Sequence, residues 1–130
     1  MLMGRKQLTV GELVKELDKA VAKCDADAVI RFDFCGLPPV RLASYRGFYE
    51  DLAIGYGGAD DEDVLLVDFA AKVKAMLGET IEGYKGGTYR VTEDTAVWVA
   101  NYGTCFGTYV CGINAHETWN CVIQTRWCSC

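Results

Sequence analysis

Residues Ser44 to Gly57 read SYRGFYEDLAIGYG, and a looser copy of this pattern returns between Gly83 and Gly103 as GYKGGTYRVTEDTAVWVANYG. Each copy has an aromatic residue, a cation and a glycine in a row, then a second tyrosine, an acidic pair, an apolar segment and a closing Tyr-Gly. The two Tyr-cation-Gly groups are Tyr45-Arg46-Gly47 and Tyr84-Lys85-Gly86. The repeated grouping predicts a surface that holds a planar, anionic ligand.

The chemistry of these groups suits a phosphate or a carboxylate beside an aromatic ring. Glycine after the cation permits close backbone approach and a positive φ, so that N–H groups and the cation surround one point. Arginine can hold a phosphate through two parallel hydrogen bonds, lysine acts as a point charge, and aromatic rings stack bases at about 1–3 kcal/mol each. The predicted ligand-binding residues are Tyr45, Arg46, Gly47, Phe48, Tyr49, Tyr84, Lys85, Gly86, Tyr89 and Asn101. Each also has a structural alternative as a cross-strand aromatic pair, a surface ion pair or, for Asn101, a turn former.

The size and charge of the chain exclude several classes of protein. Its 130 residues, 51% of them hydrophobic, predict one domain over residues 1–130. The net charge of -5 and the pI near 4.8 argue against a general nucleic-acid binder, which needs many Lys and Arg contacts to phosphates. No apolar run reaches eighteen residues, and residues 1–8 lack the apolar region of a signal peptide. We therefore expect a cytoplasmic protein that binds neither membranes nor long nucleic acids.

The sequence contains no motif that fixes a reaction. G-x-S-x-G, P-loop, H-E-x-x-H and G-x-G-x-x-G patterns are all missing. The acidic run Asp60 to Asp63 is typical of a helix N-terminus, where carboxylates interact favourably with the helix dipole. Five cysteines lie after residue 100, at spacings that fit no C-x-x-C zinc pattern. We expect free thiols, no metal, no cofactor and no catalysis; the alternatives are disulfides, a metal site that includes His116, and a metal-dependent hydrolase.

Helix and strand signals predict an α+β fold. Thr9 and Glu12 form a capping box, and apolar residues at a 3.6-residue period predict a helix from about Val10. The same spacing predicts a second helix over 66–77, which Gly78 ends. Strands are expected near 28–34, with Ile30, Phe32 and Phe34 on one face, and at 52–56, 96–102, 108–113 and 118–128. The last two are expected to be joined by a hairpin connection at 114–117. The strand at 96–102 is apolar on both faces and is predicted to be central. The expected architecture is a mainly antiparallel sheet of about five to seven strands with two helices on one face.

Three segments resemble small uncharacterised proteins encoded by bacteriophages and prophages. They are SYRGFYEDLAI (Ser44 to Ile54), GYKGGTY (Gly83 to Tyr89) and DTAVWVANYG (Asp94 to Gly103). The resemblance covers roughly residues 8–103. Phage accessory proteins of this size include anti-defence sponges, which bind and sequester the nucleotide signals of bacterial immune systems such as Thoeris and CBASS. By this analogy the resemblance implies a viral protein that acts in the host cytoplasm.

The predicted function is non-enzymatic sequestration of a small nucleotide-like anion, of cyclic-nucleotide or ADP-ribose type. We also expect a homo-oligomer, since two chains can bring their motifs together around one ligand. The alternative is a protein–protein interaction module or an inhibitor of a host enzyme, in which Tyr, Trp and Arg anchor an interface. A ligand site requires Arg46 and Lys85 to converge on one concavity, whereas an interface spreads the aromatic residues over a flat patch.

Overall fold

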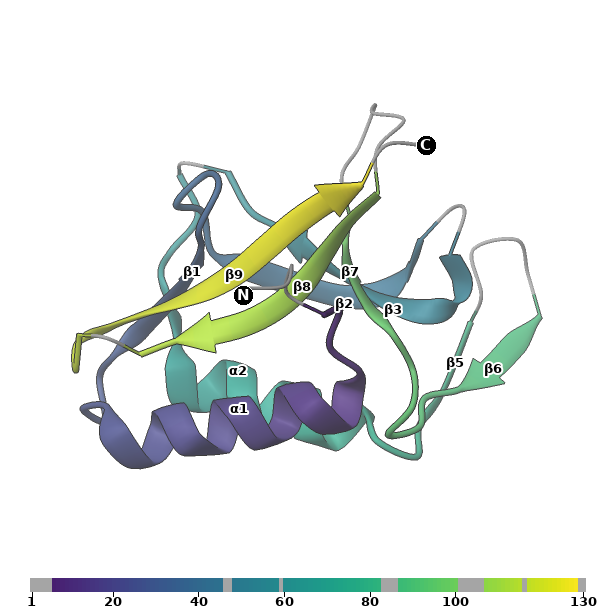
Figure 1. Cartoon of the computed structure of the whole chain (residues 1–130), viewed down its shortest axis with the longest axis horizontal. Coiled ribbons are helices and arrows are strands. Elements are labelled where there is room, and N and C mark those ends of the chain that lie inside the picture. Colours follow the sequence, from purple (N-terminus) through teal and green to yellow (C-terminus); the bar gives the residue numbers. More distant parts are fainter. Residues whose placement is uncertain are drawn as a thin grey trace.

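Two helices cover one face of a seven-stranded sheet, and a separate two-stranded ribbon lies beside it (Figure 1). The computed structural model describes residues 6–45, 48–58, 60–82, 87–100, 107–115 and 117–128. The helices are α1 (Val10–Lys23) and α2 (Leu66–Met76). The strands are β1 (Val29–Phe32), β2 (Pro39–Tyr45), β3 (Phe48–Tyr56), β4 (Val64–Leu65), β5 (Thr80–Glu82), β6 (Thr88–Arg90), β7 (Val97–Val99), β8 (Gly107–Asn114) and β9 (Asn120–Cys128). The expected α+β fold is confirmed.

Helix α1 begins where the capping box predicts. The Thr9 hydroxyl accepts a hydrogen bond from the Glu12 backbone N–H at 3.3 Å, and the Glu12 carboxylate accepts one from the Thr9 N–H at 2.9 Å. These contacts satisfy N–H groups that have no partner inside the first helical turn. The apolar stripe of the helix then buries Leu13 and Leu17 completely against the sheet.

The capping box supports a first prediction. Thr9→Ala removes the acceptor for the Glu12 N–H, so we expect the free energy of unfolding in urea to fall by about 1 kcal/mol. The hydrogen bond from the Thr9 backbone lowers the pKa of Glu12 below 4.5. The contribution of this carboxylate is therefore present above pH 4.5 and is lost as the pH falls through the lowered pKa. Glu12→Gln should weaken this acid dependence, whereas Glu16→Gln, on the same helix, should not; equal acid profiles for the two variants would contradict the assignment.

The main sheet combines antiparallel and parallel neighbours. Its strand order is β2-β3-β7-β8-β9-β1-β4. The pairs β2–β3, β7–β8, β8–β9 and β1–β4 are antiparallel, whereas β3–β7 and β1–β9 are parallel. A parallel pair needs a crossover connection, and α2 with the β5–β6 ribbon lies between β3 and β7 in the chain. The predicted apolar strand at 96–102 contains β7, which lies inside the sheet between β3 and β8.

The segment before α1 belongs to the same sheet. Leu8 lies between the ends of β7 and β8, where its N–H donates to the Val110 carbonyl at 2.8 Å and its carbonyl accepts from the Val97 N–H at 3.1 Å. Thr9 forms a further antiparallel bridge with Ala96. The chain therefore enters α1 from a fixed point between two strands, which orients the helix under the sheet.

Aromatic rings join strands that are not neighbours in the sheet. The Phe32 ring, at the end of β1, meets the Tyr56 ring of β3 edge to face, with centroids 6.2 Å apart at 83°. Phe34 lies 5.5 Å from the Phe32 ring and 5.6 Å from the Tyr56 ring. This contact across the strand order shows that the sheet is strongly coiled. The expectation that Phe34 shares the buried face is wrong, because β1 ends at Phe32 and Phe34 lies in the following turn, 50% exposed.

Helix α2 packs against the same core as α1. It buries Leu66, Phe69, Ala70 and Val73, and it ends before Gly78, whose φ of 84° is the left-handed conformation that glycine adopts most readily. The acidic run before it was expected to interact with the helix dipole. Instead, β4 lies between the run and the helix, and the N-cap Leu65 makes no side-chain hydrogen bond. Asp63 of the run forms an ion pair with Arg31 at 2.9 Å.

Within the described part of the chain, no helix is long and apolar enough to span a bilayer.

Candidate functional site

A row of side chains crosses the sheet on the face opposite the helices. Paired positions on five neighbouring strands form it: Ala43 in β2, Ala53 in β3, Trp98 in β7, Tyr109 in β8 and Arg126 in β9. Paired residues point their side chains to the same face, with Cβ atoms about 5 Å apart. The chain neighbours Leu52 and Val97 are fully buried with the helices, so alternation places this set on the other face. We call these five residues the aromatic row.

The aromatic row places two rings beside a cation. The half-buried Trp98 and Tyr109 rings meet edge to face, with centroids 6.4 Å apart at 89°. Arg126 stands opposite Tyr109, is exposed, and forms no ion pair with any described residue. Ala43 and Ala53 are small, so the row carries no bulky side chain on the β2 side of Trp98. Two rings next to a guanidinium that has no ion pair within the described part of the chain suit a ligand with a planar ring and a negative charge.

The carboxylate of Asp51 holds the indole of Trp98 in place. The Trp98 Nε1–H donates to Asp51 Oδ2 at 2.8 Å, and both side chains are partly buried. A hydrogen bond to an ionised acceptor is stronger than a neutral one, at about 1.5–3 kcal/mol. Trp98 therefore has one fixed orientation before any ligand arrives, which limits the entropy that binding must remove.

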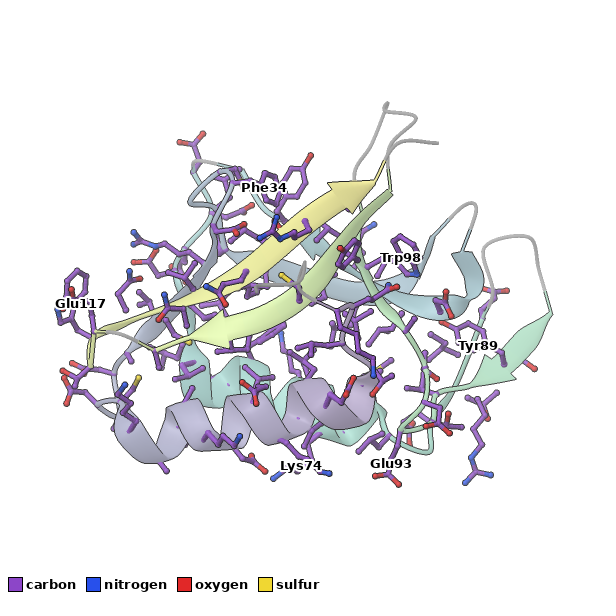
Figure 2. All side chains as sticks on the ribbon, in the orientation of Figure 1. Phe34, Lys74, Tyr89, Glu93, Trp98 and Glu117 are labelled. Atoms are coloured by element: carbon purple, nitrogen blue, oxygen red, sulfur yellow. The ribbon has the colours of Figure 1, made fainter. Side chains whose placement is uncertain are left out.

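Tyr89 joins the two-stranded ribbon to the main sheet. Its hydroxyl donates to the backbone carbonyl of Asp51, and its half-buried ring packs against the hydrophobic core. Figure 2 shows Tyr89 and Trp98 beside β3. Asp51 belongs to the first sequence motif, and Tyr89 and Trp98 belong to the second. The two motifs thus converge on one residue, through its carbonyl and its carboxylate.

The sequence-predicted site residues lie largely outside the described part of the chain. Arg46, Gly47, Tyr84, Lys85, Gly86 and Asn101 fall outside it, and Tyr45, Phe48 and Tyr49 are described only as backbone positions in β2 and β3. Residues 46–47 connect β2 to β3, and residues 83–86 connect β5 to β6. Both connections close antiparallel hairpins, which the Tyr89–Asp51 hydrogen bond holds together. Tyr89, the remaining predicted residue, has a structural role through this bond.

Sequence reasoning missed Asp51, Trp98, Tyr109 and Arg126 as candidate site residues. A signal was present, because Ala96, Trp98 and Ala100 alternate with the buried valines of β7, so that one aromatic side chain stands between small ones on the outer face. The row itself could not be predicted, because it depends on the parallel register of β3 with β7, in which Ala53 pairs with Trp98. No local pattern encodes that register.

Cys24, Cys35 and Cys121 are free thiols, and the Cys111 thiol donates to the Gln124 carbonyl at 3.5 Å. Burial raises the pKa of the Cys121 thiol to about 12, so it stays protonated and weakly reactive at neutral pH. Over the described residues, no three or more His, Cys, Asp or Glu side chains are grouped so that they could hold a metal ion.

No protein-family model matches the chain, and no significant match to it is found among curated proteins or among solved structures.

Proposed function

We propose that this protein binds a small anion with a planar ring, of nucleotide type, on the aromatic row and holds it without converting it. The observation that carries the proposal is the register that places Trp98, Tyr109 and Arg126 side by side on one sheet face. The rings contact the base or another planar group, and the Arg126 guanidinium contacts the phosphate. Arg46 and Lys85, the cations predicted from the sequence, lie outside the described residues and stay predictions.

The energies of these contacts fit a reversible binder. The Trp98 and Tyr109 rings are perpendicular, so one of them stacks on the base, at about 1–3 kcal/mol, and the other meets its edge. A charge-assisted hydrogen bond from arginine adds about 1.5–3 kcal/mol. The sum, about 2.5–6 kcal/mol, corresponds to dissociation constants from about 10 mM to tens of micromolar. Further cations, or a second chain in a homo-oligomer, would tighten binding beyond this range.

The resemblance to phage-encoded proteins supports a biological setting for this binding. A phage protein that sequesters a cyclic-nucleotide or ADP-ribose-type signal in the host cytoplasm needs affinity and abundance, but no catalytic group. The aromatic row supplies recognition chemistry of that kind. Sequestration of an immune signal is therefore the role that we propose.

Thermal unfolding with a panel of cyclic and ADP-ribose-type nucleotides tests the proposal. A ligand at one hundred times its dissociation constant adds about 2.7 kcal/mol to the stability of the native state, which raises the Tm by several degrees. Arg126→Ala should reduce the shift, and Arg46→Ala tests the sequence-predicted cation in the same assay. Lys15→Ala is the control, because Lys15 is an exposed cation on α1, on the other side of the sheet.

Chromatography of the nucleotide after incubation separates binding from turnover. We expect the ligand that shifts the Tm to be recovered intact, in an amount that matches the protein. A chemically altered nucleotide would make the protein an enzyme and overturn the sequestration proposal. Two results would contradict binding on the aromatic row. One is the absence of a Tm shift with every nucleotide of the panel, and the other is an equal Tm shift in the wild type and in Arg126→Ala.

A further inference from the structure

A second surface lies at the open edge of the main sheet. β2 is an end strand and pairs with β3 alone among the described strands. A groove of about 290 Å³ lies between this strand and α2. Residues 39–42 form one wall, and the face of α2 from Phe69 to Met76 forms the other. The aromatic row is on the opposite face of the sheet from α2, so the two surfaces are separate.

The groove runs along β2 where the pairing of this strand with β3 is irregular. Four consecutive residues of the strand line it, and the register shifts between Pro39 and Arg41, so strict alternation of side chains does not hold at Val40. On α2, Phe69, Lys72 and Met76 line it at spacings of three and four residues, which is one side of a helix. A strand edge facing one side of a helix leaves an elongated space that fits an extended chain.

The lining of the groove is apolar, with two cations. Phe69 is 2% exposed and forms the floor, while Val40, at the strand edge, is 43% exposed. Arg41 and Lys72 are both exposed. Among the described residues no carboxylate lines the groove, and neither cation forms an ion pair. Lys74, two positions along the same helix, instead pairs with Asp18 at 3.2 Å. On a chain of net charge -5, these two cations flank the edge of β2, with Lys72 on the helix side and Arg41, by alternation, on the face of Ala43.

We propose that this groove binds an extended, acidic peptide segment of a partner protein as an added strand on β2. An edge strand leaves every second pair of backbone N–H and C=O groups unpaired, and a peptide that adds to the sheet satisfies them. Pro39 has no N–H, and the register of β2 shifts between Pro39 and Arg41, so the new ladder begins at Arg41. From Arg41 to Ala43, before the next register shift, it has room for about three residues, or roughly 10 Å. An apolar side chain of the peptide enters the groove on the α2 side, where a neighbouring carboxylate meets Lys72. A carboxylate that points to the other face of the added strand meets Arg41, which lies two residues before Ala43 in β2.

Selection from a random decapeptide library by ribosome display tests this site on the full chain. The library is selected on the wild-type protein and counter-selected on Ala75→Phe, in which a ring fills the groove from an exposed helix position. Enriched peptides are then labelled with fluorescein and titrated by anisotropy. Ala71→Phe is the matched control, since Ala71 is also exposed on α2 but does not line the groove.

We expect enriched peptides to carry Asp or Glu near an apolar residue. Their affinity should fall at least tenfold on Ala75→Phe and on Lys72→Glu, and it should stay unchanged on Ala71→Phe. Circular dichroism checks that each variant is folded. If the larger side chain of Ala75→Phe disturbs the helix, Lys72→Glu still tests the groove, because it changes only a charge on an exposed side chain. No enrichment, basic peptides, or equal binding to Ala75→Phe would overturn the proposal. Dimerisation of the wild type in sedimentation that Ala75→Phe abolishes would also overturn it, because the occupant would then be a second copy of the chain.

Discussion

Phe32→Ala is expected to lower the free energy of unfolding by about 3–5 kcal/mol, the usual loss when a large core side chain is truncated. Phe32 is 1% exposed and contacts the Tyr56 ring across the coiled sheet. Its removal leaves a cavity at the place where β1 and β3 approach one another. For a domain of this length the loss corresponds to a decrease in Tm of about 10–20 °C, which calorimetry or thermal circular dichroism will measure.

Phe34→Ala is the matched control for this prediction. Phe34 has the same chemistry, is close in sequence and also contacts Tyr56, but it is 50% exposed. We expect it to cost about 1 kcal/mol, because half of its surface already faces water. Similar losses for the two variants would contradict the conclusion that the buried Phe32 stabilises the core more than the exposed Phe34 does.

The second large effect is expected at Asp51. Asp51→Ala removes the charged acceptor of the Trp98 indole and leaves a partly buried N–H without its partner, at a cost of about 2 kcal/mol in urea unfolding. The Tyr89 hydroxyl keeps its partner in this variant, because it donates to the Asp51 backbone carbonyl. The loss therefore reports on the carboxylate–indole contact.

A double-mutant cycle isolates that contact. Asp51→Ala and Trp98→Phe should be less destabilising together than the sum of the two single variants, with a coupling free energy of about 1–2 kcal/mol. Asp51→Asn, which retains an acceptor oxygen without the charge, should lose less than Asp51→Ala. Additive effects of the two substitutions would show that the carboxylate does not orient the indole.

The helices were predictable from the sequence because their signals are local. Thr9 and Glu12 are three residues apart and contact each other directly, so the capping box located the start of α1. The stripe from Leu66 to Val73 repeats at the helical period and meets the core as expected. The β8–β9 hairpin was also predicted, since two apolar segments with a short connection usually pair with each other.

The sheet order was not predictable, because it depends on contacts between distant segments. The parallel pairs β3–β7 and β1–β9 join residues far apart in sequence, and the insertion of Leu8 between β7 and β8 leaves no local pattern. The error at Phe34 has a simple cause. Strict alternation continued past Phe32, but the chain turned there, and alternation of side chains holds only within a strand.

The site residues predicted from the sequence and the residues of the aromatic row are different. The sequence indicated a surface with aromatic residues and cations, and the two motifs that suggested it meet at Asp51. The side chains that the fold sets in register, Trp98, Tyr109 and Arg126, belong to three different strands. β8 and β9 come after the second motif in the chain and are placed beside β7 by sheet pairing, so motif spacing alone did not reveal the row.

The Trp98 indole N–H signal during a nucleotide titration tests the central claim most directly. The chain has three tryptophans, and Trp98→Phe assigns the signal in a nitrogen–proton correlation spectrum. We predict that the nucleotide that raises the Tm moves this signal in a saturable way, while Trp119, which is 60% exposed and outside the aromatic row, keeps its position. A nucleotide that stabilises the protein but leaves the Trp98 signal unmoved would contradict binding on the aromatic row.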